Sequence, residues 1–377
     1  MNYEIRHFNT PVLRFSADDG AETNLAVLWV TEETDMLPLD MGGQGADDVM
    51  AWLRHRTIPR NRAYVNSLLA AMGLSPNRPM DIIKASKGLS LNDSYWVVEE
   101  NFEGSFEKYN LYDNRFSRVL GLIAFTGYGS NNPSGMTSSP ELTTNGMLPK
   151  CWRRDGGIKL FKGGTEGASN TGNEPYSEFY AAKIAHILGV NAIDYTLSMW
   201  KGRLCSVCDI FTSKDLAYVP IGRIVKTGGM KAVREFYVSL GEEFVQALNE
   251  MIIFDAVIYN TDRHYGNFGV LVDSKTNQIV APAPLFDHGN GLFSLAGQLA
   301  LESEKAMEQY AATLMPCVYD DFVQEAKAVM TREQRNRLRS LLQLRLKRHS
   351  KYNLPKERLT LIEKQVVKRV QALLLEE

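Results

Sequence analysis

The sequence predicts an α+β protein in which a strand-rich part with one long helix precedes a helix-rich part. Short strand-like runs prevail up to about residue 225, and amphipathic helical patterns dominate from Lys226 onwards. The 377 residues, 44% of them hydrophobic, are enough for two or three domains with separate cores. We therefore predict an N-terminal α+β region over residues 1–126, a second strand-rich part over 127–225 and a helical part over 226–377.

The composition disfavours several classes of protein. A net charge of −2 at pH 7 offers no basic surface for a phosphate backbone, so direct nucleic-acid binding is not expected. No segment approaches about eighteen uninterrupted apolar residues, and the N-terminus "MNYEIRHFNT" does not resemble a signal peptide. We expect a cytoplasmic protein without membrane contact. The four cysteines are too few for a disulfide scaffold, and the C-x-x-C of Cys205 and Cys208 is interpreted as part of a buried strand.

The first region is predicted to contain short strands and a helix. Residues 26–30 and 95–100 have the pattern of strands, and Asn61 to Met72 has helical spacing. The stretch "LRHRTIPRNR" gathers four arginines beside a proline, namely Arg54, Arg56, Arg60 and Arg62. Solvated loop charge is the interpretation we favour, and contact with an anion or a partner is the alternative.

A turn-rich stretch over residues 127–146 is interpreted as a linker or mobile loop whose last residues contact phosphate. Asp155-Gly156-Gly157 then predicts a tight hairpin turn, and a glycine-bearing loop that leads into a hairpin can lay backbone N–H groups over phosphates. A helix is predicted from Glu174 to Gly189, followed by strands at "YTLSMW" and "LCSVCDIF". The long helices predicted in the last part are Phe236–Tyr259, Tyr319–Lys347 and Glu357–Leu375.

A cluster of polar residues follows the first of these long helices. In "NTDRHYGNFG", Asp262 and Asn267 are five positions apart, and Asp287 stands twenty residues later in the D-x-G of "PLFDHGNG". Phosphoryl-transfer enzymes of the protein-kinase type use an Asp to orient the attacking hydroxyl, and an Asn and a later Asp to hold magnesium ions. Carboxylate and amide oxygens suit magnesium, which prefers hard ligands. The spacing therefore predicts a phosphoryl-transfer site.

Two other interpretations of this cluster stay open at the level of the sequence. Asp262 and Asn267 are also residue types that cap a helix end and a turn. His264 and His288, together with the two aspartates, would suit a metal-dependent hydrolase. We favour a loop-bracing role for His264 and assign no chemistry to His288.

A kinase also needs a cation that grips the nucleotide phosphates and a carboxylate that steers this cation. Lys159 in the strand "GIKLFK" and Glu178 on the following helix have the right order. Lys162 lies on the opposite face of the same strand and competes with Lys159. Glu174 competes with Glu178, although its place in the first helical turn suits the helix dipole. The residues alone leave the choice of lysine open.

Together these segments resemble the HipA-like family of atypical bacterial serine/threonine kinases. The likeness rests on "YNTDRHYGNFG", "PLFDHG", "IKLF" and "SEFYAAKIAHILG", and covers roughly residues 137 to 377. D-R-H-x-x-N adds a distant likeness to phosphoinositide kinases. The resemblance implies a two-lobed protein-kinase-like fold with a strand-rich N-lobe and a helical C-lobe, preceded by the extra N-terminal region. It also implies ATP and Mg²⁺ as cofactors.

The resemblance implies a role for each matched residue. Asp262 matches the catalytic base, and Asn267 and Asp287 match the magnesium ligands. Lys159 matches the ATP lysine and Glu178 its helix partner. "TTNGMLPK" is similar to the phosphate-binding loop, in which Thr143 replaces a serine that some members phosphorylate, and "VCDIF" is similar to the hinge that meets adenine. The implied nucleotide-binding residues are Lys159, Thr143, Thr144, Gly146, Lys150, Asp209, Phe211 and His264.

Three functional hypotheses follow from this reading. The first is a protein serine/threonine kinase that acts as a toxin or regulator, phosphorylates itself and has a small DNA-binding antitoxin as partner. The second is a kinase that acts on a lipid headgroup or another small molecule. The third is an interaction module of a toxin–antitoxin pair with weak or no catalysis.

Overall fold

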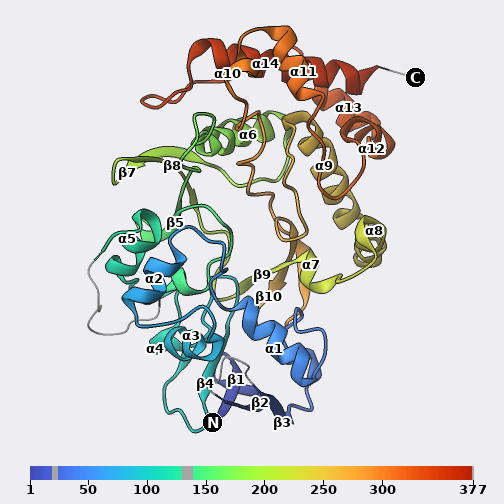
Figure 1. Ribbon diagram of the computed structural model, residues 1–377. Coiled ribbons are helices and arrows are strands. Elements are labelled where there is room, and N and C mark those ends of the chain that lie inside the picture. The colour runs from blue at the N-terminus through green and yellow to red at the C-terminus, as the bar shows by residue number, and fades with distance from the viewer. Residues whose placement is uncertain (19–23, 130–138, 376–377) are drawn as a thin grey trace. The chain divides into compact units, whose positions relative to one another are not determined.

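The computed structural model describes residues 1–18, 24–129 and 139–375, so that part of the predicted linker falls outside the described residues. The chain divides into two compact units (Figure 1). Unit 1 consists of Met1–Lys162, Asp209–Val219 and Val270–Val280, and unit 2 consists of Gly163–Cys208, Pro220–Gly269 and Ala281–Glu377. Each unit therefore joins segments that are far apart in the sequence.

Unit 1 begins with a four-stranded antiparallel sheet in the order β3-β2-β1-β4. Its strands are β1 (Asn2–His7), β2 (Thr10–Ala17), β3 (Leu25–Val30) and β4 (Tyr95–Glu99). Alternate side chains of a strand point to the same face of a sheet. Ile5 of β1 and Leu13 of β2 are fully buried in this way and belong to one core with Trp52 of α1 (Ala46–His55).

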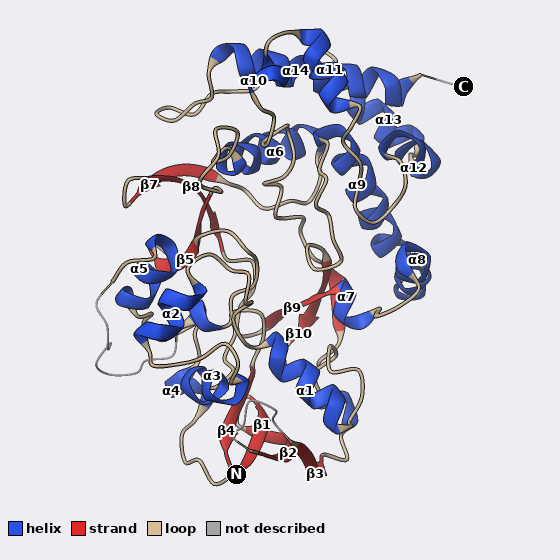
Figure 2. Ribbon diagram, in the orientation of Figure 1, coloured by secondary structure: helices blue, strands red, loops and turns tan. Residues whose placement is uncertain are grey.

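Short helices joined by loops follow in the N-terminal third of the chain (Figure 2). They are α2 (Val65–Ala71), α3 (Pro79–Ser86), α4 (Phe106–Tyr109) and α5 (Arg118–Thr126), with 3₁₀ turns η1 (Thr34–Met36) and η2 (Pro140–Leu142). A second buried cluster joins α2, α3 and α5 to Leu142 of η2. The segment that leads into the predicted phosphate loop is therefore packed into the core of the N-terminal third.

Two further β structures lie largely in unit 1. β5 (Lys150–Arg154) and β6 (Ile158–Gly163) form an antiparallel hairpin. The backbone N–H of Asp155 donates to the carbonyl of Gly157 at 2.9 Å, so the predicted tight turn is confirmed. A three-stranded sheet in the order β11-β10-β9 consists of β9 (Leu216–Pro220), β10 (Gly269–Asp273) and β11 (Ile279–Pro282).

Unit 2 is mainly helical. Its helix α6 (Glu174–Leu188) ends at Gly189, which caps the helix in the left-handed conformation, as predicted. The antiparallel hairpin of β7 (Thr196–Trp200) and β8 (Arg203–Asp209) follows. The later helices are α7 (Ile221–Ile224), α8 (Gly229–Leu240), α9 (Glu242–Ile258), α10 (Gln298–Leu301), α11 (Glu304–Ala311), α12 (Phe322–Val329), α13 (Arg332–Leu338), η3 (Arg339–Leu341) and α14 (Lys356–Leu374).

Two of the predicted long helices are interrupted. Gly241 separates α8 from α9 at φ +122°, a backbone angle that favours glycine. The helix predicted over Tyr319–Lys347 is wrong in extent, because it is divided into α12 and α13 and residues 342–355 are not helical. Thr331 starts α13 by a capping box with Gln334, which ends the first helix and begins the second.

Most other elements fall where the sequence predicts them. α2 is shorter than predicted, because Tyr64 precedes it with φ +61°. Cys205 is buried in β8, as predicted, whereas Cys208 is half-buried. In the described part of the chain, no helix combines the length and the apolar composition needed to cross a bilayer.

Candidate active site

The buried guanidinium of Arg263 connects two loops of unit 2. Its Nε and Nη2 donate to the two carboxylate oxygens of Asp255 in α9, at 2.8 and 3.0 Å. Its Nη1 donates to the backbone carbonyls of Asn267 and Phe286. Burial alone would lower the pKa of Arg263, but the charge and hydrogen bonds of Asp255, together with the charge of Asp287, raise this pKa above its ordinary value. One buried ion pair therefore holds the loop after α9 against the D-x-G loop.

The carboxylate of Asp262 is oriented by neighbouring amide groups. Nδ2 of Asn290 donates to Oδ2 of Asp262 at 2.9 Å, and Nδ2 of Asn267 donates to the backbone carbonyl of Asp262 at 3.1 Å. The backbone N–H of Asp262 donates to Oδ1 of Asn260 at 3.3 Å, and Nδ2 of Asn260 donates to Asp255 at 3.0 Å. The structure thus brings two of the predicted site residues, Asp262 and Asn267, into direct contact.

Helix α6 supports the backbone around Asp287. Asp287 adopts φ +58°, a left-handed angle that is uncommon for residues other than glycine. The N–H of His288 donates to Oε2 of the fully buried Glu178 at 2.8 Å, and the hydroxyl of Ser177 donates to the carbonyl of His288 at 2.6 Å. The predicted helix carboxylate is therefore held one residue away from the predicted metal ligand.

A buried tyrosine lies behind the same loop. The backbone N–H of Asp287 donates to the hydroxyl oxygen of Tyr195 at 3.3 Å. Burial raises the pKa of Tyr195 well above its ordinary value, and the nearby carboxylates of Glu178 and Asp287 add to this effect. Tyr195 therefore stays a neutral hydrogen-bonding group at physiological pH.

The two histidines of the region have structural contacts. Nδ1 of His264 accepts the N–H of Gly266 at 3.0 Å, a contact within the loop, and Nδ1 of the buried His288 lies 3.0 Å from Nη2 of Arg263. Among the residues with described positions, no group of three or more His, Cys, Asp and Glu side chains is placed to hold a metal ion. The ligand set of a metal-dependent hydrolase is therefore not found there. A magnesium site is of another kind, since much of its coordination comes from waters and substrate phosphates.

The predicted phosphate loop of unit 1 folds against β5. Nζ of Lys150 donates to the carbonyl of Asn145 at 2.9 Å. Gly146 lies over this ammonium group, so that a Cβ at position 146 would come within 2.2 Å of Nζ, and Gly146 has φ +92°. The backbone angle favours glycine here, and any larger residue would also have to displace the end of the Lys150 side chain.

The two threonines of this loop bond inward. The hydroxyl of Thr143, which is 5% exposed, donates to the carbonyl of Leu89 at 2.7 Å. The hydroxyl of Thr144 donates to the carbonyl of Pro140 at 2.6 Å and accepts Nε1–H of Trp152 at 3.0 Å. The hydroxyl that matches the phosphorylated serine of the resemblance is therefore buried in this structure.

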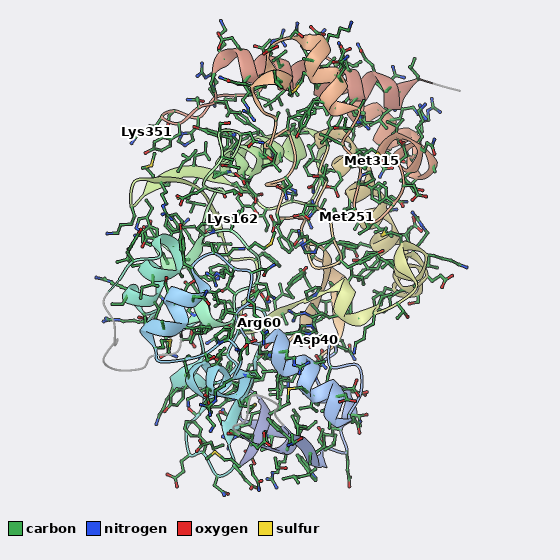
Figure 3. All side chains as sticks on the ribbon, in the orientation of Figure 1. Asp40, Arg60, Lys162, Met251, Met315 and Lys351 are labelled. Atoms are coloured by element: carbon green, nitrogen blue, oxygen red, sulfur yellow. The ribbon has the colours of Figure 1, made fainter. Side chains whose placement is uncertain are left out.

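The β5–β6 hairpin places the two candidate lysines on opposite faces. Lys159 forms an ion pair of 2.8 Å with Asp209, whose side chain is 72% exposed. Lys162, labelled in Figure 3, is 6% exposed and lies directly opposite Lys150 in the strand register. Side chains opposite each other in a hairpin share a face. Lys162 therefore shares the face that carries Lys150 and the glycine loop, whereas Lys159 shares the face of Cys151.

The predicted hinge lies beside the turn of this hairpin. The N–H of Ile210 donates to the carbonyl of Ile158 at 3.0 Å, and Phe211 packs edge to face on Tyr218 with ring centroids 5.4 Å apart. Unit 1 thus holds the predicted nucleotide-binding residues Thr143, Thr144, Gly146, Lys150, Lys159, Asp209 and Phe211. Unit 2 holds Glu178, Asp262, His264, Asn267 and Asp287.

Comparison with known proteins identifies the fold. No protein-family model and no curated protein sequence matches the chain. HipA of Shewanella oneidensis MR-1, from the structure of the toxin–antitoxin system HipA, HipB and its operator DNA, is 14% identical with a TM-score of 0.58, and the match covers 100% of both chains. The Helicobacter pylori proinflammatory kinase CtkA is 15% identical over 61% of this chain and 92% of its own, with a TM-score of 0.49. The chain has a HipA-like fold.

The HipA-like fold confirms the fold class that the sequence predicted, but several residues that hold its loops were missed. The sequence could have predicted the role of Asp255, because an acidic residue inside the apolar run "IIFDAVIY" is expected to be buried and paired with a cation. The contact of Asn290 with Asp262 and that of Tyr195 with Asp287 had no such signal, since no spacing in the sequence relates these residues.

Proposed function

We propose that the chain is an ATP- and Mg²⁺-dependent kinase of the HipA-like type, which transfers the γ-phosphoryl group of ATP to a serine or threonine of a protein. The observation that carries the proposal is the buried pair of Arg263 and Asp255, which holds the loop of Asp262 and Asn267 against the loop of Asp287. These residue types and this order are what kinase-type phosphoryl transfer needs. The HipA-like fold supports the same class of function.

Asp262 is the residue that we propose to orient the acceptor hydroxyl and to accept its proton. A general base must be held in one orientation and must keep an oxygen within hydrogen-bonding reach of the proton. Asn290 donates to Oδ2 of Asp262, and Asn267 holds its backbone carbonyl. We propose Oδ1 as the oxygen that receives the acceptor proton.

Asn267 and Asp287 are the proposed ligands of Mg²⁺, and their chemistry fits this ion. The Nδ2 group of Asn267 is already fixed by the carbonyl of Asp262, so that the hard amide oxygen is the end left for a cation. Bound Mg²⁺ would neutralise negative charge that develops on the phosphoryl group. The task of the protein is to keep the two loops in register, which Arg263 does through the carbonyls of Asn267 and Phe286.

For the nucleotide phosphates we propose the glycine loop together with Lys150 and Lys162. The family pattern favoured Lys159, but Lys162 is buried on the face of the hairpin that carries Lys150 and Gly146. Lys159 instead pairs with the exposed carboxylate of Asp209. Glu178 remains the proposed helix carboxylate, and Asp209 and Phe211 remain the proposed hinge residues for adenine.

The roles of the two aspartates are tested with Asp262→Asn and Asp287→Asn, which keep the side-chain shape and remove the charge. Asp262→Asn is expected to lower the rate of phosphoryl transfer by about a hundredfold or more, the effect typical of positioned acid–base groups. Asp287→Asn is expected to lower this rate as well, because a proposed ligand of Mg²⁺ is lost. Phosphorylation is measured by mass spectrometry after incubation with ATP and Mg²⁺. Asp47→Asn, on the exposed first turn of α1, is the matched control and should keep wild-type activity.

Ligand binding separates the two roles. Asp262→Asn should keep the rise in melting temperature that ATP with Mg²⁺ causes, because this side chain is proposed to meet only the acceptor. Asp287→Asn should reduce that rise, because a metal ligand is lost. Near wild-type phosphorylation by either variant would contradict the assigned roles.

We also propose a small DNA-binding antitoxin as partner, because HipA of Shewanella oneidensis MR-1 forms a complex with HipB and its operator DNA.

Two experiments test the alternative functions. In the first, labelled ATP is offered with a cell lysate and with lipid vesicles, and label in the lipid would favour a lipid kinase over a protein kinase. A chain that binds a small helix-turn-helix partner but shows no melting shift with ATP and Mg²⁺ would favour an interaction module.

A further inference from the structure

Two of the four arginines in "LRHRTIPRNR" are buried, contrary to the interpretation as solvated loop charge. The side chain of Arg62 is 0% exposed and that of Glu141 is 1% exposed, and the two form an ion pair of 3.0 Å. Nη1 of Arg62 also donates to the backbone carbonyls of Glu141 and Thr144, at 2.8 and 3.2 Å. Nη2 donates to the carbonyl of Lys150 at 2.7 Å. A single guanidinium therefore contacts the 3₁₀ turn before the phosphate loop, the start of the loop and its end.

Further hydrogen bonds attach the phosphate loop next to the pair of Arg62 and Glu141. Oε1 of Glu141 accepts the backbone N–H of Trp152 in β5 at 2.8 Å, and the N–H of Ala63 donates to the carbonyl of Met147 at 2.8 Å. Burial raises the pKa of the Glu141 carboxyl, and the charge of Arg62 opposes this rise. The loop is thus attached to the N-terminal third of the chain as well as to the hairpin that follows it.

The anchored loop has the chemistry of an anion site. Within the part of the chain that the structure describes, the backbone N–H groups of residues 145–148 have no protein acceptor. Gly146 has a left-handed backbone angle, and Nζ of Lys150 lies beneath it. Successive N–H groups around a left-handed residue form a concave site that suits phosphate oxygens.

We propose that Arg62 is a positioning residue for nucleotide binding, which holds the loop of residues 143–150 in its phosphate-binding shape before the nucleotide arrives. The inference rests on the proposed function. A loop that is already ordered does not lose conformational entropy when the ligand binds, so its order adds to affinity. Arginine suits this task because its planar group spreads five N–H donors over three nitrogen atoms, whereas a lysine has three donors on a single nitrogen.

The test uses the double variant Arg62→Met/Glu141→Gln in the full chain. It removes both buried charges together, which proteins tolerate better than the loss of one partner, and keeps an acceptor for the N–H of Trp152. Arg56→Met is the matched control. Arg56 is equally buried, donates to the carbonyls of Gly88 and Tyr95 and pairs with Asp93, but has no contact with the loop among these bonds.

The readout compares two ligands by calorimetry, ATP with Mg²⁺ and adenosine without phosphates. The double variant should bind ATP with Mg²⁺ at least about tenfold more weakly, the loss expected for one or two phosphate hydrogen bonds. Its affinity for adenosine should stay within about twofold of the wild type. Hydrogen exchange should become faster at Thr143 and Ala63, whose N–H groups donate to the carbonyls of Pro140 and Met147. Arg56→Met should leave both affinities unchanged, even if it lowers the melting temperature.

The outcomes separate this inference from the proposed function. If the wild type binds ATP and the double variant binds it equally well, or loses ATP and adenosine affinity alike, the positioning role is wrong and the kinase proposal stands. If Arg62→Met/Glu141→Gln fails to fold, Arg62→Lys takes its place, with the same expected split between the two ligands. If the wild type binds no ATP, both the proposed function and the inference fall.

Discussion

Each of the two units contains a buried arginine that holds separate segments of the chain together. Arg263 and Arg62 each pair with a carboxylate, Asp255 and Glu141 respectively, and each donates further hydrogen bonds to carbonyls of separate segments. A buried guanidinium is costly unless its donors are satisfied. All three nitrogens of Arg263 have partners, whereas Nε of Arg62 has none within the described residues. Loops that contact such a group are therefore fixed relative to it, and the proposed phosphoryl transfer would need this precision.

The choice between the two lysines gives a prediction at the same scale. Lys162→Met should raise the KM for ATP by about 10- to 100-fold, the effect of losing a charge-assisted hydrogen bond to phosphate. Lys159→Met should change the KM little, because Lys159 pairs with the exposed Asp209 on the other face of β6. Steady-state kinetics of the two variants measures both KM values. A larger rise in KM for Lys159→Met than for Lys162→Met would show that Lys159 is the ATP lysine, as the family pattern implied.

At the scale of elements, ion pairs connect helices α11 and α14 on the exposed surface of unit 2. Glu304 accepts hydrogen bonds from Lys364 at 2.6 Å and from Lys368 at 2.5 Å, and Lys368 also contacts Glu308. The hydrogen bonds from Lys364 and Lys368 lower the pKa of Glu304 to about 2. Such pairs are partly screened by solvent, so the effect on stability is small.

The lowered pKa of Glu304 predicts how the stability of the folded protein changes with pH. The contribution of this carboxylate is complete above its ordinary pKa of about 4.5 and is lost as the pH falls towards the folded-state value of about 2. Glu304→Gln should therefore lower the melting temperature at pH 7, and the difference from the wild type should vanish as the pH approaches 2. Glu302→Gln, on a neighbouring exposed residue, is the control, and a pH-independent difference would refute the assignment.

At the scale of the whole molecule, the buried clusters of unit 1 contain residues from both sides of the domain boundary predicted at residue 126. Leu142 of η2 packs with Leu120 and Ile123 of α5, and Trp152 and Ile158 of the β5–β6 hairpin pack against the cluster around Leu89. The N-terminal third therefore shares its core with the phosphate loop and the hairpin, which gives this third a physical role.

A truncated chain tests this shared core. A fragment of residues 127–377 should be insoluble or partly unfolded, because it exposes the apolar side chains that normally pack against residues 58–124. Solubility and cooperativity of thermal unfolding, compared with the full chain, provide the measurement. A soluble fragment with a cooperative transition would show instead that the predicted boundary separates independent domains.

The sequence by itself determined much of the local structure and indicated which residues are candidates for the site. Hairpin turns, the glycine cap of α6 and most strands depend on neighbours in the chain, so their residues predict them. The long helices were less predictable, because Gly241 and the capping box of Thr331 act against a continuous apolar pattern. The spacing of Asp262, Asn267 and Asp287 can be read from the sequence, and it indicates a candidate site because kinase-type phosphoryl transfer uses these residue types in this order.

Only the tertiary structure decided which groups hold those residues in place. Arg62 lies 79 positions from Glu141, and Asn290 lies 28 positions from Asp262, so no local pattern relates either pair. The face of Lys162 likewise depends on the strand opposite it, and on the loop that folds over that face. Contacts between distant segments arise when the chain buries its apolar surface, and for this reason they appear only once the fold is formed.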